Sequence, residues 1–461
     1  MKKLAIACLL LLYMQPLNAA DILTAEFADD LSGVKVKLCF DGRSPNRLYR
    51  NAQAAEWSDG IFHSDTRLRV SERGGSIRLP ALPDQACIHW RSNFHTALDK
   101  KNYRLILQRG EDLVMSANLW FWKGPRQRDL IVHVILPAGM SFSTPWALLG
   151  NTEGYTSYRP DNTPAQWESR VAVGRFELQI IDVPGAQIRL ATLGNLSVEQ
   201  HEKFRIWIKE SVLAVASVFG SFPQPQPQVL VIPIGQRREA TQGARISRGG
   251  GLSALLLVDE NRPLEEFTAD WTATHEFSHM LFPYISSRDR WLSEGLASYY
   301  QNVLRARNGR LTETQAWQKL YEGFQRGEKS THGGTLAQAT RDGWRSTMRV
   351  YWSGAALMLQ ADMQLRESSG GRQSLDTALQ SLSHCCMENG RTWRAREMFK
   401  QLDELTNTRI FSNLYQRHVH AESFPDMRST WEHLGVNTYN DRVSLTDEAP
   451  LATVRASIMQ G

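Results

Sequence analysis

The sequence has 461 residues, of which 42% are hydrophobic and 22% are charged. This composition is ordinary for a folded chain with a substantial core and excludes wholesale disorder, and the length allows about three domains. The formal net charge is only +5. Because the basic residues are spread along the chain, we expect no nucleic-acid partner.

The first twenty residues have the layout of a secretory signal peptide. Two lysines precede an apolar run from Leu4 to Leu12, and alanines follow at positions 19 and 20. The run is shorter than the roughly 20 residues that span a bilayer. We therefore expect residues 1–20 to be a signal peptide, with a signal anchor as the alternative. The remaining chain is predicted to be exported, periplasmic or secreted, without stable membrane insertion.

Four cysteines follow the predicted signal peptide. Exported proteins fold in an oxidising environment, so we predict a disulfide between Cys39 and Cys87, with two buried thiols as the alternative. Cys385 and Cys386 are adjacent and lack the spaced partners of a thiolate metal site. These two cysteines are either free or joined to each other.

Hydrophobic and polar residues alternate through much of residues 21–195. Turn residues such as Pro184 and Gly185 separate the alternating runs. Many short strands with turns between them are typical of a β-sandwich. We therefore predict a β-sandwich domain over residues 21–195, some of whose runs could instead be irregular loops.

At Ser197 the hydrophobic period changes to that of a helix. Ser197 and Gln200 have the spacing of a capping box, and apolar residues then recur at helical spacing. Buried strands are predicted at 229–234 and 252–258. After Pro263 the pattern is helical to about residue 435. An α/β region followed by a helical region is therefore expected.

The segment Thr274–Met280 carries the clearest chemical signal. His275 and His279 are four residues apart in a helical window, so they present two imidazoles to one point. Zinc accepts histidine nitrogens at about 2.0–2.1 Å. Glu276 projects beside the two imidazoles, where it can act as a general base that takes a proton from an attacking water.

A catalytic zinc site needs three protein ligands and one open position. Glu294 lies in the next predicted helix, and Pro283 with the polar segment 286–289 supplies the reversal between the two helices. We therefore predict one zinc ion per chain, held by His275, His279 and Glu294. The alternative is two solvated or core histidines and an unrelated surface carboxylate.

These motifs resemble those of the gluzincin metallopeptidases, and the whole chain is most similar to their glycyl aminopeptidase family. The resemblance includes Trp291–Tyr300 and Val350–Ala355, with a similar layout at 371–382 and 411–418. We accordingly predict a multidomain α+β fold with no PDZ module, although that module is common in the family. Its predicted parts are the N-terminal β-sandwich (21–195), a thermolysin-like catalytic α/β domain (196–306), a C-terminal α-helical domain (307–440) and a tail (441–461).

The resemblance also implies two roles beyond the metal ligands. Tyr351 would donate to the oxyanion that forms during hydrolysis, its alternative being a core aromatic. Gly249, Gly250 and Gly251 resemble a glycine-rich edge strand that pairs with the substrate backbone, their alternative being a flexible loop. Aminopeptidases of the wider group carry a glutamate just after these glycines to hold the substrate amine, but residues 252–254 contain no carboxylate.

We therefore predict a zinc-dependent peptidase that acts on peptide substrates, with Glu276 as general base. The resemblance favours an aminopeptidase. The absent glutamate leaves an endopeptidase of the same mechanism open. An inactive peptide- or partner-binding protein with a vestigial metal site is the alternative from another class. No pattern in the sequence indicates an oligomeric state.

Overall fold

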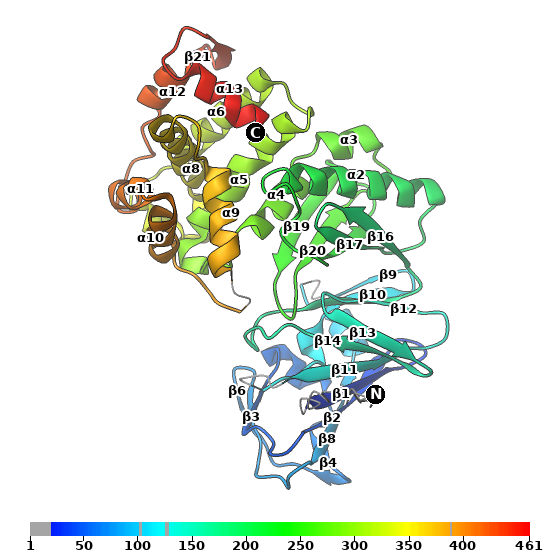
Figure 1. The fold of residues 1–461 in the computed structure, drawn as a ribbon. Helices are drawn as coiled ribbons and strands as arrows, with labels where there is room; N and C mark the ends of the chain where they lie inside the picture. The colour runs from blue at the N-terminus through cyan, green and yellow to red at the C-terminus, as the bar shows by residue number, and fades with distance from the viewer. Residues whose placement is uncertain (1–19, 101–103, 125–128, 388–389) are drawn as a thin grey trace, which may run out of the picture.

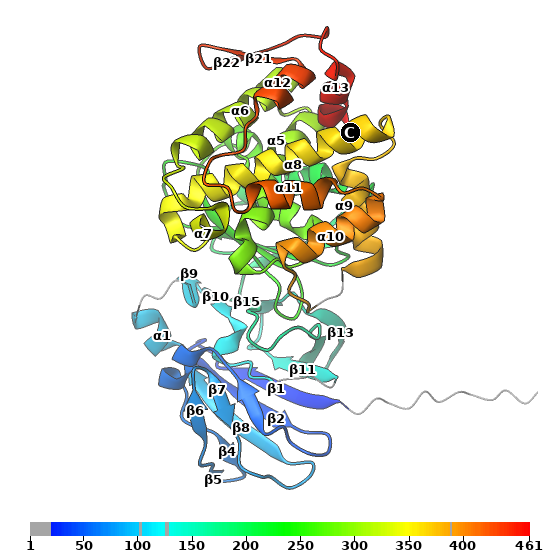
Figure 2. The same cartoon turned by 90° about the vertical axis from the view of Figure 1, so that its left-hand side faces the viewer.

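The computed structural model describes residues 20–100, 104–124, 129–387 and 390–461. The predicted signal peptide lies outside the described residues except for its last residue. Figures 1 and 2 show a β-rich N-terminal part at one end of the molecule, joined to an α/β part, with the C-terminal helices beside the latter. The fold is therefore a mixed α+β architecture built from several parts.

Two sheets of the N-terminal part share one hydrophobic core. The eight-stranded sheet has the order β13-β14-β11-β1-β2-β8-β4-β5, and the four-stranded sheet has the order β12-β15-β10-β9. Leu23 and Val36 of the first sheet are buried together with Met115 and Val173 of the second. A small third sheet has the order β3-β7-β6. The strand bounds are β1 (Asp21–Phe27), β2 (Gly33–Cys39), β3 (Arg47–Tyr49), β4 (Phe62–His63), β5 (Thr66–Arg67), β6 (Ser71–Arg73), β7 (Ser76–Arg78), β8 (Cys87–Asn93), β9 (Ile106–Arg109), β10 (Asp112–Ser116), β11 (Leu130–Ile135), β12 (Ser141–Ser143), β13 (Ala147–Thr152), β14 (Tyr155–Arg159) and β15 (Arg170–Gly174).

The four-stranded sheet is buried on both faces and joins the N-terminal part to the α/β part. Leu113 and Met115 of β10 face the N-terminal core. Val114, on the other face of the same strand, packs with Leu230 and Ile232 of the α/β part. Since both faces of β10 are covered, its sequence shows no alternation of polar and apolar residues.

A five-stranded sheet forms the centre of the α/β part. Its order is β16-β17-β18-β20-β19, with β17, β18 and β20 parallel and β19 antiparallel at one edge. The bounds are β16 (Glu177–Val183), β17 (Ala186–Thr192), β18 (Gln228–Pro233), β19 (Thr241–Ser247) and β20 (Ser253–Val258). β16 and β17 belong to this sheet because Leu190 pairs with Val229. The predicted boundary between residues 195 and 196 therefore divides the sheet.

Helices cover the face of this sheet that lies away from the N-terminal part. Phe204 and Ile208 of α2 (Val198–Ala216) are buried with Val229 and Val231 of β18. The predicted capping box begins α2, since the Ser197 hydroxyl accepts a hydrogen bond from the Gln200 amide. Two shorter helices follow, α3 (Leu264–Ala269) and α4 (Thr272–Ser278), and α4 is continued by the 3₁₀ turn His279–Leu281.

The C-terminal helices are organised around the close crossing of α5 and α8. A Cβ on Gly354 would lie 2.0 Å from the carbonyl oxygen of Trp291, and one on Gly295 would lie 2.4 Å from the Cα of Gly354. Only glycines permit this approach, which brings the start of α8 against the start of α5. The helix bounds are α5 (Arg290–Arg307), α6 (Glu313–Lys329), α7 (Leu336–Ala339), α8 (Thr347–Ser369), α9 (Leu375–Cys386), α10 (Ala395–Thr406), α11 (Ile410–His418), α12 (Arg428–Leu434) and α13 (Ala452–Gln460), with α1 (His95–Asp99) in the N-terminal part.

Buried hydrogen bonds to Asp362 fasten three of these helices together. Its carboxylate accepts from the Tyr299 hydroxyl of α5 at 2.7 Å, from Arg366 of α8 at 3.1 Å and from the Leu375 amide of α9 at 2.8 Å. A fully buried carboxylate is tolerated when its oxygens are satisfied in this way. The helix that carries Glu294 is thereby held rigidly against its neighbours.

Residues 441–461, predicted as a tail, fold back onto the helices. They contain β22 (Arg442–Leu445), which pairs with β21 (Val436–Tyr439), and also α13. Arg455 of α13 donates to Glu313 of α6 at 2.8 Å, and Ile458 is fully buried. The helices in the described part of the chain do not combine the length and apolarity needed to cross a bilayer.

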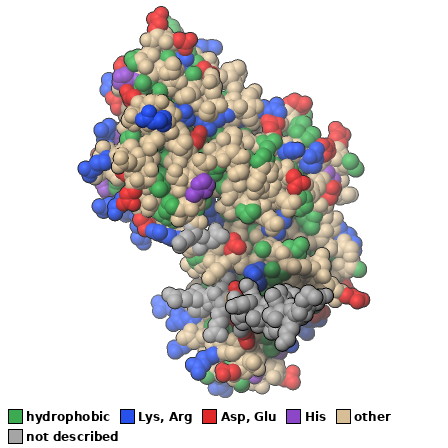
Figure 3. Space-filling view, viewed as in Figure 1, with side chains coloured by type: hydrophobic (Ala, Val, Ile, Leu, Met, Phe, Trp, Pro, Cys, Tyr) green, Lys and Arg blue, Asp and Glu red, His purple; other side chains and the backbone are tan. Residues whose placement is uncertain are grey.

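Two disulfides are present. Cys39 of β2 is joined to Cys87, the residue directly opposite on β8. Cys385 and Cys386 are joined to each other at the end of α9. On the face shown in Figure 3, basic and acidic side chains both occur over the helical and the β-rich parts.

Candidate metal site

The structure brings the three predicted metal ligands together. His275 lies on α4, His279 begins the 3₁₀ turn that continues it, and Glu294 lies on α5. The Oε2 atom of Glu294 is 3.3 Å from Nε2 of His275 and 3.6 Å from Nε2 of His279. The ligand atoms of all three residues lie within 4.8 Å of one another.

This arrangement fits a zinc ion. Donor atoms that share a tetrahedral zinc at about 2.0–2.1 Å lie about 3.3 Å apart, close to the 3.3 and 3.6 Å separations measured from Glu294 to the two imidazoles. Two imidazoles and one carboxylate are a ligand set that leaves a fourth position open for a reactant, as catalytic zinc sites require.

Two further side chains of α5 orient the imidazoles. Nδ1 of His275 is 2.8 Å from Oε1 of Gln301, and Nδ1 of His279 is 3.1 Å from Oγ of Ser293. When Nδ1 of His275 donates its hydrogen to Gln301, its Nε2 is left unprotonated and free to bind a metal. Neither role is predicted from the sequence. Gln301 lies seven residues, or two helical turns, after Glu294, a spacing that indicates the same helix face.

Replacing Gln301 with Leu should lower zinc affinity by about 10–100-fold, because His275 loses the partner that fixes its tautomer and ring orientation. Competition with a zinc-binding dye measures this change. Gln360→Leu is a matched control, since Gln360 is 8% exposed, Gln301 is 7% exposed and Gln360 hydrogen-bonds Asp426 away from the metal site. Parental affinity in the Gln301 variant would contradict this role.

The two carboxylates of the site have pKa shifts in opposite directions. Burial raises the pKa of Glu276, although the neighbouring His279 and His275 oppose that shift. Burial also acts to raise the pKa of Glu294, but hydrogen bonds from His275 and His279 outweigh it and hold this pKa well below its usual range. Glu294 is thus kept ionised, as its predicted role as a ligand requires, while Glu276 has the greater proton affinity, as its predicted role as a general base requires.

Tyr351 of α8 lies beside the metal ligands. Its ring stacks on that of His275, with the centroids 5.8 Å apart and the planes 4° apart. Burial and the carboxylates of Glu294 and Glu276 raise the pKa of the Tyr351 hydroxyl far above its usual value. A hydrogen bond to Glu294 contributes to this shift, and the hydroxyl stays protonated at neutral pH.

A cavity of about 280 Å³ opens beside these residues. Its lining includes Glu276, His279, Glu294 and Tyr351, together with residues 244–246 of β19 and the segment that leads into α5. Because β19 is the edge strand of the sheet, the cavity is bordered on one side by an extended backbone. The predicted catalytic groups therefore line one cavity, beside the edge strand.

The three predicted substrate-binding glycines are not among the described residues that line this cavity. The amide of Gly249 donates to the Glu168 carbonyl, and that of Gly250 donates to the Thr163 hydroxyl. A Cβ on Gly251 would lie 2.2 Å from the carbonyl oxygen of Pro145. The glycines do permit close backbone approach, but the approaching backbone is residues 145–168 of the same chain. The sheet edge beside the cavity is β19 instead.

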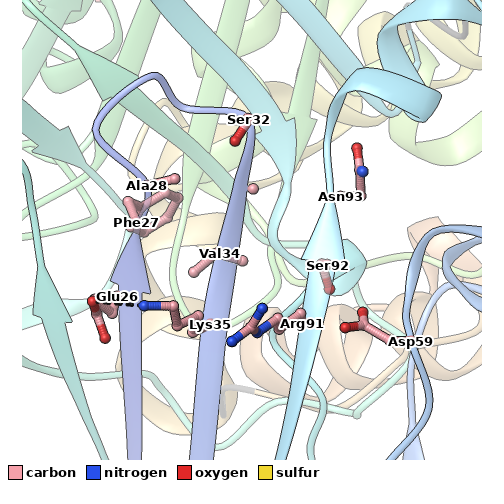
Figure 4. A pocket seen from close by; sticks show the side chains of 11 residues that line it. Glu26, Phe27, Ala28, Ser32, Val34, Lys35, Asp59, Arg91, Ser92 and Asn93 are labelled. Atoms are coloured by element: carbon pink, nitrogen blue, oxygen red, sulfur yellow. Dashed lines mark hydrogen bonds and ion pairs between the residues drawn. The ribbon is translucent and has the colours of Figure 1, made fainter.

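A larger cavity of about 420 Å³ lies in the N-terminal part, beside β1, β2 and β8. Figure 4 shows its lining, in which Lys35 is paired with Glu26 at 3.2 Å. The described residues that line it include no histidine or cysteine, and their acidic side chains form no metal-binding group. The residues suited to hydrolysis therefore belong to the smaller cavity.

Solved structures share this fold at low sequence identity. The aminopeptidase N family protein from Idiomarina loihiensis is 13% identical with a TM-score of 0.71, over 90% of this chain and 78% of that one. The M1 zinc metallopeptidase from Deinococcus radiodurans is 12% identical with a TM-score of 0.56, over 88% and 93%. Yeast LTA4 hydrolase, solved with Bestatin, is 11% identical with a TM-score of 0.56, over 86% and 65%.

These likenesses define the class of fold, which is the mixed α+β, multidomain architecture of the M1 zinc metallopeptidases. One of the structures is a variant of the Deinococcus radiodurans protein bound to a Tyr-Ser-Ala substrate. No family model matches the sequence, and no curated protein matches it.

Proposed function

We propose that the protein is a zinc-dependent peptidase of the gluzincin type, similar to the glycyl aminopeptidase family. The observation that carries this proposal is the convergence of His275, His279 and Glu294 within 4.8 Å, with Glu276 and Tyr351 facing the same cavity. The thermolysin-like character of the α/β part is proposed on the same basis. The peptide bound to a protein of the same fold supports peptides as the substrate class.

The side chains divide the steps of hydrolysis among them. Zinc, when bound, supplies a Lewis acid for the scissile carbonyl and makes a nucleophilic water available near neutral pH. Glu276 takes the proton of the attacking water and passes it to the leaving amine. Tyr351 donates a hydrogen bond to the oxygen on which negative charge develops. Gln301 and Ser293 keep the two imidazoles in position.

The substrate backbone is proposed to pair with β19. This strand is at the end of the sheet order, so one of its edges is not paired within the sheet. An extended peptide can add to such an edge through main-chain hydrogen bonds. Because residues 244–246 of β19 line the cavity, a peptide bound there would pass beside Glu276 and Tyr351.

An endopeptidase of the same mechanism is the second candidate. Among the described residues that line the cavity, the carboxylates are Glu276 and Glu294, and both are used in the chemistry. An aminopeptidase needs a further anion to hold the free amine of its substrate. Relative cleavage of free and N-acetylated versions of one peptide separates the two candidates.

The proposal is tested by digesting a mixed peptide library and reading the products by mass spectrometry. We expect hydrolysis that stops when a chelator removes the metal and returns when zinc is added. The positions of the cut bonds report whether cleavage starts from a terminus. Stoichiometric zinc without hydrolysis of any peptide would instead favour an inactive binding protein with a vestigial metal site.

We also propose that the chain is exported. The pattern of residues 1–20 supports this. The disulfide between Cys39 and Cys87 supports it as well, because such bonds persist in oxidising compartments. The N-terminus of the mature protein, determined after expression of the whole chain, is expected at Asp21.

A further inference from the structure

The charge around the cavity is unusual for an enzyme that would hold a free amine. Apart from Glu276 and Glu294, the charged side chains among the described lining residues are Arg245, Arg248 and Arg290. A bound zinc ion would balance the two carboxylates. The three guanidinium groups therefore make the remainder of the cavity positive, which repels an ammonium group and attracts an anion.

Arg248 has a structural role that accounts for its position. Its Nη2 atom donates to the carbonyl oxygens of His279 and Phe282. These bonds hold the turn that follows the two histidines. Arg245, on β19, is about half exposed, and its Nη1 atom is 3.7 Å from Glu168, a residue that also pairs with Arg170. Arg245 therefore keeps most of its hydrogen-bonding capacity.

No hydrogen bond or ion pair of this kind accounts for the position of Arg290 among the described residues. Its Nε and Nη2 atoms are buried and have no hydrogen-bond partner in the described part of the chain. These two atoms form the edge of a guanidinium group that binds a carboxylate through two parallel hydrogen bonds. Arg50 presents the same edge to Glu72, and Arg310 presents it to Glu210. In Arg290 both atoms of this edge lack such a partner among the described residues.

The position of Arg290 connects it to the catalytic groups. It is the first residue of α5 and lies four residues, or about one helical turn, before Glu294. It lines the same cavity as Glu276, Glu294 and Tyr351. An anion held by Arg290 would therefore lie close to the bond that is cleaved.

We propose that Arg290, assisted by Arg245, binds a carboxylate of the peptide substrate and selects for peptides that are acidic next to the cleaved bond. This inference rests on the proposed peptidase function and specifies its substrate class. The carboxylate belongs to a Glu or Asp side chain or to the C-terminus of a short peptide. Both sources offer the same planar group to the Nε–Nη2 edge.

The test uses one parent peptide in four forms, with either Glu or Gln beside the cleaved bond and either a free or an amidated C-terminus. For the parental enzyme, kcat/KM should be higher for the form that carries the recognised carboxylate. In Arg290→Gln this preference should fall by about 10- to 100-fold, the range for hydrogen bonds to charged groups. If replacing Glu with Gln in the peptide lowers kcat/KM, the recognised carboxylate is the side chain. If amidation lowers kcat/KM, the recognised carboxylate is the C-terminus.

Two further variants keep the result interpretable. Arg288→Gln removes an exposed neighbouring arginine that does not line the cavity, and it should leave the preference unchanged. Arg290→Lys keeps the charge but loses the paired donors, so its preference should fall between those of the parent and the Gln variant. If the melting temperature shows that Arg290→Gln does not fold, the preference of the Arg290→Lys variant is compared with that of the parent instead.

Binding of the same four peptides to the Glu276→Gln variant, measured by calorimetry, provides a readout that does not depend on turnover. The inference would be overturned if the Glu276→Gln variant bound all four forms equally and the parental protein cleaved all four equally. The peptidase proposal would remain in that case. A lack of cleavage of any peptide, together with a lack of binding, would instead remove the proposed function on which the inference rests.

Discussion

Replacing Glu276 with Gln is expected to lower kcat by about 10²–10⁴-fold, the range for a general acid–base residue, while stoichiometric zinc stays bound. The amide has the size of the carboxyl group but cannot accept the proton of the attacking water. The metal should remain because its three converging ligands are His275, His279 and Glu294. Turnover of a peptide found in the library digest and elemental analysis of zinc measure the two outcomes.

The matched control for this variant is Glu265→Gln, on the exposed surface of α3. It should keep both its zinc and its activity. Parental turnover by the Glu276 variant would show that the mechanism is wrong. If zinc and activity were lost together, Glu276 would have to be counted among the ligands, and a different residue would have to move the proton.

The convergence of His275, His279 and Glu294 could be predicted because it depends on local rules and one short reversal. The spacing of His275 and His279 follows from helix periodicity, and the turn after Pro283 limits where the next helix can go. The role of Gln301 cannot be predicted from the sequence, although it lies on the same face of α5 as Glu294, because a glutamine at helical spacing has no chemical signature of its own. Its role appears only when the imidazole of His275 is placed beside it.

The strands could be predicted where one face is polar, but their sheet membership could not. The alternation in residues 177–192 correctly indicates two strands, yet alternation does not tell which sheet a strand joins. That choice is made by the parallel pairing of Leu190 with Val229, which depends on residues far apart in the sequence. β10 is less predictable from the sequence, because burial of both its faces removes the alternation of polar and apolar residues.

The glycines at 249–251 show a different limit. A run of glycines indicates that some backbone comes close, but it does not identify that backbone. In the structure the neighbouring segment is the one near Pro145 and Glu168. Arg290 could not be singled out from the sequence, since an arginine at the start of a helix has no distinctive pattern. It is distinguished only in the structure, where its buried Nε and Nη2 atoms have no hydrogen-bond partner among the described residues.

Replacing Glu294 with Gln should weaken zinc binding, whereas the same replacement at Glu276 should leave zinc bound. The neutral amide is a poor zinc ligand and removes the negative charge between the two imidazoles. Zinc affinity should fall by more than the roughly 100-fold that loss of a supporting partner such as Gln301 can cause. Dye competition measures this affinity, and activity at limiting zinc should fall with it.

Thermal unfolding provides an independent measure of the same prediction. An ion that binds only the folded state at about 1,000 times its Kd stabilises it by about 4 kcal/mol, so zinc should raise the melting temperature of the parental protein and of Glu276→Gln. For the Glu294→Gln variant the same concentration is at most about 10 times the Kd, so zinc should stabilise it by about 1.4 kcal/mol or less and raise its melting temperature much less. Glu276 and Glu294 line the same cavity and undergo the same substitution, so a difference in zinc stabilisation between the two folded variants reports metal binding. Parental zinc affinity in Glu294→Gln would mean that the α5 helix supplies no ligand, and the peptidase proposal would lose its basis.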